Sequence, residues 1–464
     1  MPAPDTWPPT PMRSIRPTNA KINADLLRPV NKPGRGWYAT VTVSVLVVLA
    51  AAGALTYQFS RGLGVWGINR PVFWALDITN FVFWIGISHA GTLISAILRV
   101  TGAEWRRPIT RCAEAITVFA LMIGAMFPII HLGRPWFFYW LVPYPNERGL
   151  WPNFRSPLAW DFFAISTYLL GSIIYLYLPL IPDLALLRDK SRGLWRRFYG
   201  TLSLGWRGTE LQWDRLERAV RVMAVVIIPV AVSVHTIVSW DFAMTIRPMW
   251  HSTMFGPYFV AGAIFSGIAA LIIAMAVVRR VFHLEDYLRA IHFNNLGLLL
   301  LTMSLIWFYF TFGEYLTAWY GNEPGEMAVF RSKMSGAFSP LFWGTIVCCF
   351  AVPAPLLAFK RFRTIKGTTI ASALVIIGMW FERFLIIVPT LAHPKLTFNW
   401  GTYRPTWVEM TLTAGTFGYF VLLYAIFTRI FPIIAVWEYK EGFSWQAEHE
   451  DLPSLNEPVV ASGD

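Results

Sequence analysis

The chain has 464 residues, of which 55% are hydrophobic and 14% are charged, and its mean hydropathy is +0.48. Several runs of about 20 apolar residues are each long enough to cross a bilayer as a helix. These runs are continuously apolar rather than alternating, which excludes both an ordinary soluble protein and a transmembrane β-barrel. The formal charge of +12 does not indicate nucleic-acid binding, because the basic residues cluster in loops between the apolar runs.

The chain has three cysteines, Cys112, Cys348 and Cys349, and none of them forms a CxxC pair. This count excludes a four-cysteine iron–sulfur or zinc site on this chain and argues against a disulfide framework. Residues 1–37 are polar and proline-rich, so we expect no cleavable signal peptide there but a disordered or surface-draped tail.

The apolar runs predict ten spans and an all-α polytopic membrane protein. The expected spans are residues 38–59, 71–98, 112–131, 157–181, 219–240, 256–279, 292–319, 340–359, 368–391 and 406–433. With the N-terminus in the cytoplasm, the cytoplasmic segments carry 28 of the 39 Lys and Arg residues and the outer loops carry 10. The positive-inside rule therefore predicts that both termini are cytoplasmic; in a bacterium the chain would then lie in the inner membrane with its outer loops in the periplasm.

Two span starts resemble each other: Ser156-Pro157-Leu158-Ala159-Trp160 opens the fourth span, and Ser339-Pro340-Leu341-Phe342-Trp343 opens the eighth. Ser-Pro also starts helices well by itself, but the shared Leu and Trp and the matching topology favour an internal repeat. We therefore predict two parallel four-helix bundles plus two added helices. The expected divisions are a tail (1–37), an added span and loop (38–70), the first bundle (71–255), the second bundle (256–405), the last span (406–433) and an acidic, solvated tail (434–464).

The segment between the third and fourth spans, FPIIHLGRPWFFYWLVPYPNERGLWPNFRSPLAWD, runs from Phe127 to Asp161 and combines ionisable groups with many aromatic residues at one membrane face. His131 closes one span and Asp161 opens the next. Ionisable residues within spans are functional candidates by default. This combination of groups suits a quinone-like ligand.

Oxidation of a quinol needs acceptors for two protons, and the pKa values of His and Asp can be tuned for that task. We expect His131 and Asp161 to serve as these acceptors, with alternatives in which His131 bonds a loop carbonyl and Asp161 is a helix-start carboxylate in the first turn. Asp77, His235 and Asp241 are expected in the same outer layer. The remaining candidates for the quinol site come from the following loop: Arg134, Trp136, Phe137 and Trp151.

Other ionisable residues are candidates for a proton path. His89 and Glu114 lie nearer the cytoplasm in the first bundle, with packing and interfacial exposure as the equally weighted alternatives. Glu314, Glu382 and Arg383 lie in the second bundle, where a structural ion pair is the favoured alternative to a proton path. Because Glu382 and Arg383 are adjacent on a helix, we expect each to need a partner elsewhere, with Glu314 as the partner of Arg383. The few histidines do not supply the paired axial ligands of transmembrane b-haems.

The segments FPIIHLGRPWFFYW, SPLAWD and ISHAGTLISAILRV resemble the NrfD family, the polysulfide-reductase-type membrane subunits. The resemblance covers residues 70–430. The longer loop and the ten spans are most similar to the larger NrfD-like subunit of bacterial alternative complex III.

The resemblance implies a membrane component of a respiratory complex that oxidises menaquinol or ubiquinol near the periplasmic face. Its implied partners are a periplasmic iron–sulfur subunit that takes the electrons, c-type haem subunits, a second NrfD-like membrane subunit and a terminal oxidase. The resemblance also implies coupling to proton movement and no redox metal on this chain. Two other interpretations remain open, a secondary transporter or ion-translocating module and a purely structural anchor.

Overall fold

The computed structural model describes residues 18–31, 34–142 and 157–449, and the regular secondary structure in these residues is entirely helical. Ten helical segments are long and apolar enough to cross a membrane, which confirms the expected all-α polytopic architecture. They are α3 (Arg35–Arg61), α4 (Leu76–Val100), α5–α6 (Thr110–His131), α7–α8 (Ala159–Lys190), α10 (Glu210–Ala243), α11 (Phe255–Val281), α12 (Ala290–Gly321), α14–α15 (Ser339–Ala358), α16 (Ile365–Ala392) and α17 (Trp407–Ile430).

Three of these segments are interrupted. The third consists of α5 (Thr110–Gly124) and α6 (Phe127–His131), and the fourth of α7 (Pro157–Tyr177), a 3₁₀ turn and α8 (Ile181–Lys190). The eighth consists of α14 (Ser339–Ile346), a π-helical turn and α15 (Pro353–Ala358). Each break has a proline close by, which removes a backbone donor from the helical ladder. The shorter helices are α1 (Asn19–Leu26), α2 (Arg28–Asn31), α9 (Gly193–Leu202), α13 (Pro324–Met334) and α18 (Val436–His449).

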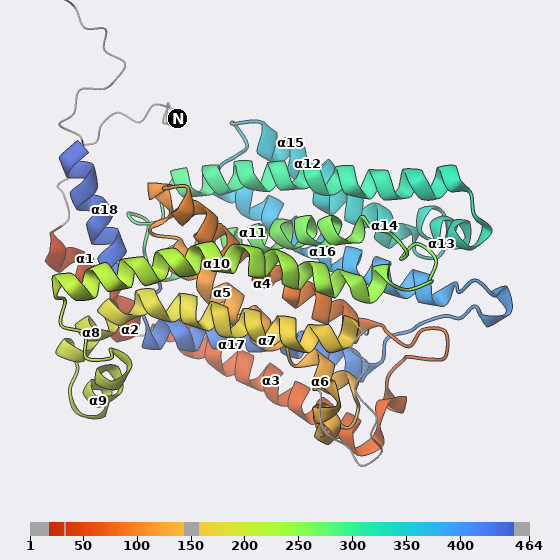
Figure 1. Ribbon diagram of the computed structural model, residues 1–464, viewed down its shortest axis with the longest axis horizontal. Helices are drawn as coiled ribbons and strands as arrows, with labels where there is room; N and C mark the ends of the chain where they lie inside the picture. The colour runs from red at the N-terminus through yellow and green to blue at the C-terminus, as the bar shows by residue number, and fades with distance from the viewer. Residues whose placement is uncertain (1–17, 32–33, 143–156, 450–464) are drawn as a thin grey trace, which may run out of the picture.

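Helix α4 lies at the centre of the molecule, with 88% of its most apolar stretch buried. It packs against α5, α10, α11 and α16, whereas α3 and α17 pair with each other on the outside (Figure 1). The helices α4, α5, α7 and α10 contact one another, and so do α11, α12, α14–α15 and α16, with α4 and α11 at the seam. The helices of these two groups are the ones expected in the two bundles. That the two bundles form an internal repeat remains a prediction.

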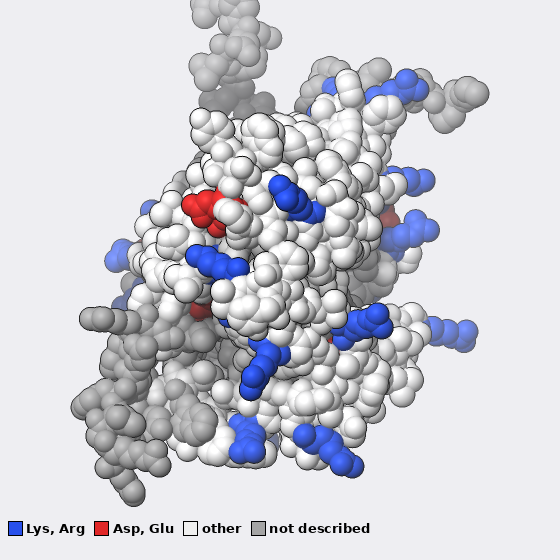
Figure 2. Space-filling view, turned by 90° about the vertical axis from the view of Figure 1, so that its right-hand side faces the viewer, with Lys and Arg blue, Asp and Glu red and all other residues white. Residues whose placement is uncertain are grey.

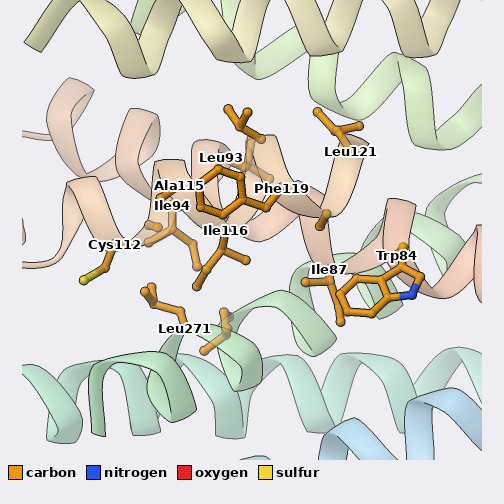
Figure 3. Packing of buried hydrophobic residues seen from close by; sticks show 14 of the residues in the cluster. Trp84, Ile87, Leu93, Ile94, Cys112, Ala115, Ile116, Phe119, Leu121 and Leu271 are labelled. Carbon is orange, nitrogen blue, oxygen red and sulfur yellow. The ribbon is translucent and has the colours of Figure 1, made fainter. Parts of the chain in front are cut away.

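The central packing is dense because α4 carries glycine where it crosses α5. A Cβ added at Gly91 would lie 2.0 Å from the backbone oxygen of Ala113. The two backbones therefore approach more closely than any larger residue allows, as is common where membrane helices cross. Figure 3 shows side chains of α4 and α5 packed between these helices and against Leu271 of α11.

The helices α1, α8, α9 and α18 lie at one end of the bundle, called here the terminal end, and α6 and α13 lie at the opposite end (Figure 1). The expectation that the segments next to the spans are solvated tails is wrong for the described parts. Ile22, Leu26 and Leu27 of the N-terminal segment are buried in the core. Glu438 of α18 is 1% exposed and accepts hydrogen bonds from arginines on the first bundle.

Candidate functional site

The opposite end of the first bundle holds the predicted site. Helix α5 ends at Gly124, and the short helix α6 starts at Phe127 with Pro128 in its first turn. This break displaces the last turn of the third span, so that His131 stands at the end of α6. The buried Gln58 of α3 fixes this turn, because its Nε2 donates to the Ile130 carbonyl at 2.9 Å.

His131 pairs with Asp77 in the first turn of α4. The His131 Nδ1 contacts the Asp77 Oδ2, and the other oxygen of Asp77 accepts from the Ala75 backbone N–H at 2.9 Å. Asp77 is buried, whereas 30% of the His131 side chain is exposed. The carboxylate therefore orients the imidazole so that its other ring nitrogen can meet a ligand.

Asp161 meets Asp241 of α10 rather than His131. Their carboxyl groups interact directly, and both residues are buried, at 4% and 7% exposure. One oxygen of each, Oδ1, has no hydrogen-bond partner among the described residues. Helix α7 carries no acidic residue in its first turn, so the expectation of Asp161 in that turn is wrong. A cap or dipole role therefore does not account for this carboxyl.

His235 does not share the outer layer with these groups. Its ring lies 4.5 Å, centroid to centroid, from that of His89, deep in the first bundle. His89 is held between two backbone carbonyls, with Nδ1 3.1 Å from the Ile85 oxygen and Nε2 against the Ala231 oxygen. Neither ring nitrogen of His235 meets a hydrogen-bond partner of good geometry among the described residues. The prediction of one layer with five ionisable groups is therefore wrong for His235.

The loop after α6 supplies the aromatic rim. Trp136 is 58% exposed and its ring lies 6.2 Å from that of Phe137. Arg134 is exposed and makes no ion pair in the described part of the chain, with Asp77 or with any other carboxylate. Trp151 lies outside the described residues. Figure 2 shows basic side chains spread over this end with little acidic surface, since the carboxyls of the site are inside.

Glu114, the candidate nearer the terminal end, is buried at 1% exposure, so the alternative of interfacial exposure is wrong for this residue. It accepts a hydrogen bond from the Ser95 hydroxyl at 2.7 Å, and the Tyr175 hydroxyl lies 3.4 Å from the same Ser95 oxygen. These contacts link α4, α5 and α7 by a small polar network.

The second bundle contains a buried charged cluster. The expectation that Glu382 and Arg383 cannot pair is wrong: Arg383 Nη1 lies 3.2 Å from Glu382 Oε2, with both side chains at most 6% exposed. The two groups are close enough for an ion pair but make no hydrogen bond to each other or to another described residue. The Arg383 guanidinium also lies 4.8 Å above the Phe259 ring. Glu314 does not pair with Arg383; it lines a cavity of about 20 Å³ with Glu382 and Lys333.

Lys333 of α13 was missed by sequence reasoning. It is 4% exposed, and burial lowers its pKa to about 8 against the opposing effect of the Glu314 and Glu382 carboxylates. In the sequence it is one of two basic residues in a loop, and its short helix has no periodic apolar face. A carboxylate at matching depth, Glu314, was the signal that a buried cation should exist nearby.

The sequence of this chain matches a known protein family. The NrfD family, described as "Polysulphide reductase, NrfD", matches residues 64–394. The chain is 27% identical over 422 residues to a putative dimethyl sulfoxide reductase membrane subunit of Halobacterium salinarum, with 86% of this chain and 92% of that protein covered. It is 23% identical to a selenate reductase subunit of Mesobacillus selenatarsenatis, with 84% of this chain and 93% of the relative covered.

A third relative is the Hdr-like menaquinol oxidoreductase integral membrane subunit of Archaeoglobus fulgidus. It is 23% identical over 411 residues, with 84% of this chain and 93% of the relative covered. The family match spans both sets of helices that pack around α4 and α11, including the Asp77–His131 and Asp161–Asp241 pairs. This chain is a multi-pass integral membrane protein that belongs to the NrfD family of polysulphide reductase membrane subunits.

Proposed function

We propose that this chain is the quinol-binding membrane subunit of a respiratory quinol:electron-acceptor oxidoreductase. The observation that carries the proposal is the pair of ionisable contacts at one end of the first bundle. His131–Asp77 and Asp161–Asp241 bring together groups from α4, α6, α7 and α10. The loop with Trp136 and Phe137 follows directly and offers flat apolar surface for a quinone ring.

The chemistry of the two pairs suits quinol oxidation. A quinol gives up two protons and two electrons, so the site needs two proton acceptors. The His131 ring nitrogen that Asp77 does not hold and the Asp161 Oδ1, which has no partner among the described residues, are the acceptors we assign. Asp77 is a positioning residue for His131, and Asp241 plays the same part for Asp161.

The electrons would leave to an iron–sulfur cluster on a partner subunit. Within the described residues, no group of three or more His, Cys, Asp or Glu side chains could hold a metal ion. The positive-inside pattern favours a periplasmic position for the site, with both termini in the cytoplasm. The relatives named as selenate reductase and menaquinol oxidoreductase subunits support membership of a multi-subunit oxidoreductase. We propose alternative complex III as the type of assembly, with the second NrfD-like, haem and oxidase subunits as partners.

Turnover of a soluble quinol by the purified assembly tests the proposal. We expect Asp161→Asn to lower kcat by at least 100-fold, since general acid–base groups contribute roughly that much, while the set of subunits in the assembly stays unchanged. Asp214→Asn is the matched control, because Asp214 is exposed on the terminal-end half of α10. Normal turnover by an intact Asp161→Asn assembly would refute the assignment. Loss of the partner subunits without a kinetic defect in the remaining assembly would favour a purely structural anchor.

A second role, proton translocation, is favoured by the cluster of the partly buried Glu314 with the buried Lys333, Glu382 and Arg383. Retaining two carboxylates and two cations within a membrane protein is costly unless they are paired or used. In liposomes containing the assembly, Glu382→Gln should then reduce the protons moved per electron and leave quinol turnover intact. A ratio equal to that of the wild type would make the cluster structural. Ion flux without any redox partner would instead favour an independent transporter.

A further inference from the structure

A cavity of about 370 Å³ lies at the terminal end, away from the site described above. It is bounded by the last turn of α4, the loop before α5, the first half of α10 and the helix α18. Its polar lining consists of Arg99, Arg106, Arg107, Arg221, Glu217, Trp437 and Glu441. Four guanidinium groups and two carboxylates therefore face one space.

Some of these guanidinium donors lack acceptors. Arg99 and Arg106 both use their terminal nitrogens on Glu438, at 2.5 and 3.2 Å, which leaves the buried Nε of each without a partner among the described residues. Arg107 is satisfied by Glu104 and Glu441. Arg221 forms no ion pair with any described residue. The buried Nε atoms do not face the cavity, whereas Arg221 is exposed at its lining, so an acceptor-rich group in the cavity would pair with Arg221 beside the guanidinium groups of Arg99 and Arg106.

The apolar part of the lining indicates what carries that group. Val100 and Val225 border the cavity and are 53% and 55% exposed on membrane-spanning helices. On α10 the exposed apolar surface includes Val222 and continues at Val226 toward the middle of the span. Arginines at the end of a span beside an exposed apolar stripe fit a charged head with an acyl chain attached.

We propose that this cavity binds the phosphate headgroup of an anionic phospholipid. The headgroup would join Arg221 of α10 to Arg99 and Arg106, and the acyl chains would lie along the valine surface of α10. Because Trp437 of α18 forms part of the wall, a bound lipid would also hold the C-terminal helix against the first bundle. Free phosphate has the same oxygen chemistry but cannot use the valine surface.

Native mass spectrometry of the delipidated assembly, with phosphatidylglycerol or phosphatidylcholine of matched chains added, tests the proposal. We expect one phosphatidylglycerol retained on this chain in preference to phosphatidylcholine. Arg221→Gln should weaken retention about fivefold, the effect of removing one basic residue near an anionic headgroup, and Arg221→Glu should weaken it further. Arg218→Gln is the matched control, since Arg218 is exposed on the same helix and does not line the cavity.

Each alternative result has a definite meaning. Equal retention in the wild type and Arg221→Gln overturns the proposal. Displacement of phosphatidylglycerol by millimolar inorganic phosphate would make this a site for free anions and overturn the lipid assignment. Lipid binding that appears only after deletion of residues 450–464 would overturn it as well, because the acidic end of the chain would then be the native occupant. Arg221→Gln should leave quinol turnover unchanged, because the predicted quinol site lies at the other end of the bundle, so this test is independent of the proposed function.

Discussion

Glu438 is the residue at which we expect the largest effect outside the quinol site. It carries a buried carboxylate on α18 that accepts from Arg99 Nη2 at 2.5 Å, from Arg106 Nη1 at 3.2 Å and from the Thr110 hydroxyl at 3.4 Å. The Glu438 side chain is only 2% exposed. Although burial raises the pKa of this carboxyl, the guanidinium groups of Arg99 and Arg106 outweigh that effect and hold it below its usual value.

The perturbation is Glu438→Gln, which keeps the shape and removes the charge. Breaking a buried ion pair costs about 3–5 kcal/mol, because the remaining charge is left uncompensated. Gln retains one acceptor, so we take the lower value, about 3 kcal/mol, for the docking of α18. At about 1.4 kcal/mol per tenfold change in an equilibrium constant, this predicts that α18 opens about 100 times more often.

Hydrogen–deuterium exchange of the α18 amides at neutral pH measures this opening. Glu441→Gln is the matched control on the same helix, since its side chain is 47% exposed and surface ion pairs contribute at most about 1 kcal/mol. We expect exchange about 100-fold faster in Glu438→Gln and less than about fivefold faster in the control. Equal exchange rates in the two variants would refute the reasoning that Glu438 anchors the helix.

Three further outcomes are expected. The folded-state pKa of Glu438 is depressed, so its stabilisation of α18 is complete above about pH 4.3 and is lost as the pH falls below that value. The opening of α18, measured as exchange relative to the intrinsic rate at each pH, should rise only there, and Glu438→Gln should remove this dependence. Gly91→Ala should destabilise the bundle by about 3 kcal/mol in thermal unfolding, because its Cβ would meet backbone on α5, whereas Gly53→Ala, with open space around it, should have no such effect. Asp77→Asn and His131→Gln should lower quinol turnover to similar extents, and the double variant should lower it no further; additive losses would show that the two act separately.

The sequence by itself determined the all-helical class, the ten spans and their approximate limits. Each span is a long apolar run, and a chain in hydrocarbon must satisfy its backbone hydrogen bonds within that run. Ionisable residues within apolar runs also stand out, so the sequence alone singles out Asp77, Asp161 and Glu382 as functional candidates. These features depend on local composition, which a sequence displays directly.

The tertiary structure alone decided which ionisable groups meet. Depth along a span is readable from residue number, but the direction of a side chain and the break between α5 and α6 are not. Hence His131 pairs with Asp77 while Asp161 pairs with Asp241, and the His235 ring lies against the His89 ring instead of joining them. Likewise Glu438 lies in a segment with the composition of a solvated tail. It is a buried anchor only because Arg99 and Arg106, more than 300 positions earlier in the chain, contact it in the fold. Such pairings depend on contacts between distant segments, which no local pattern encodes.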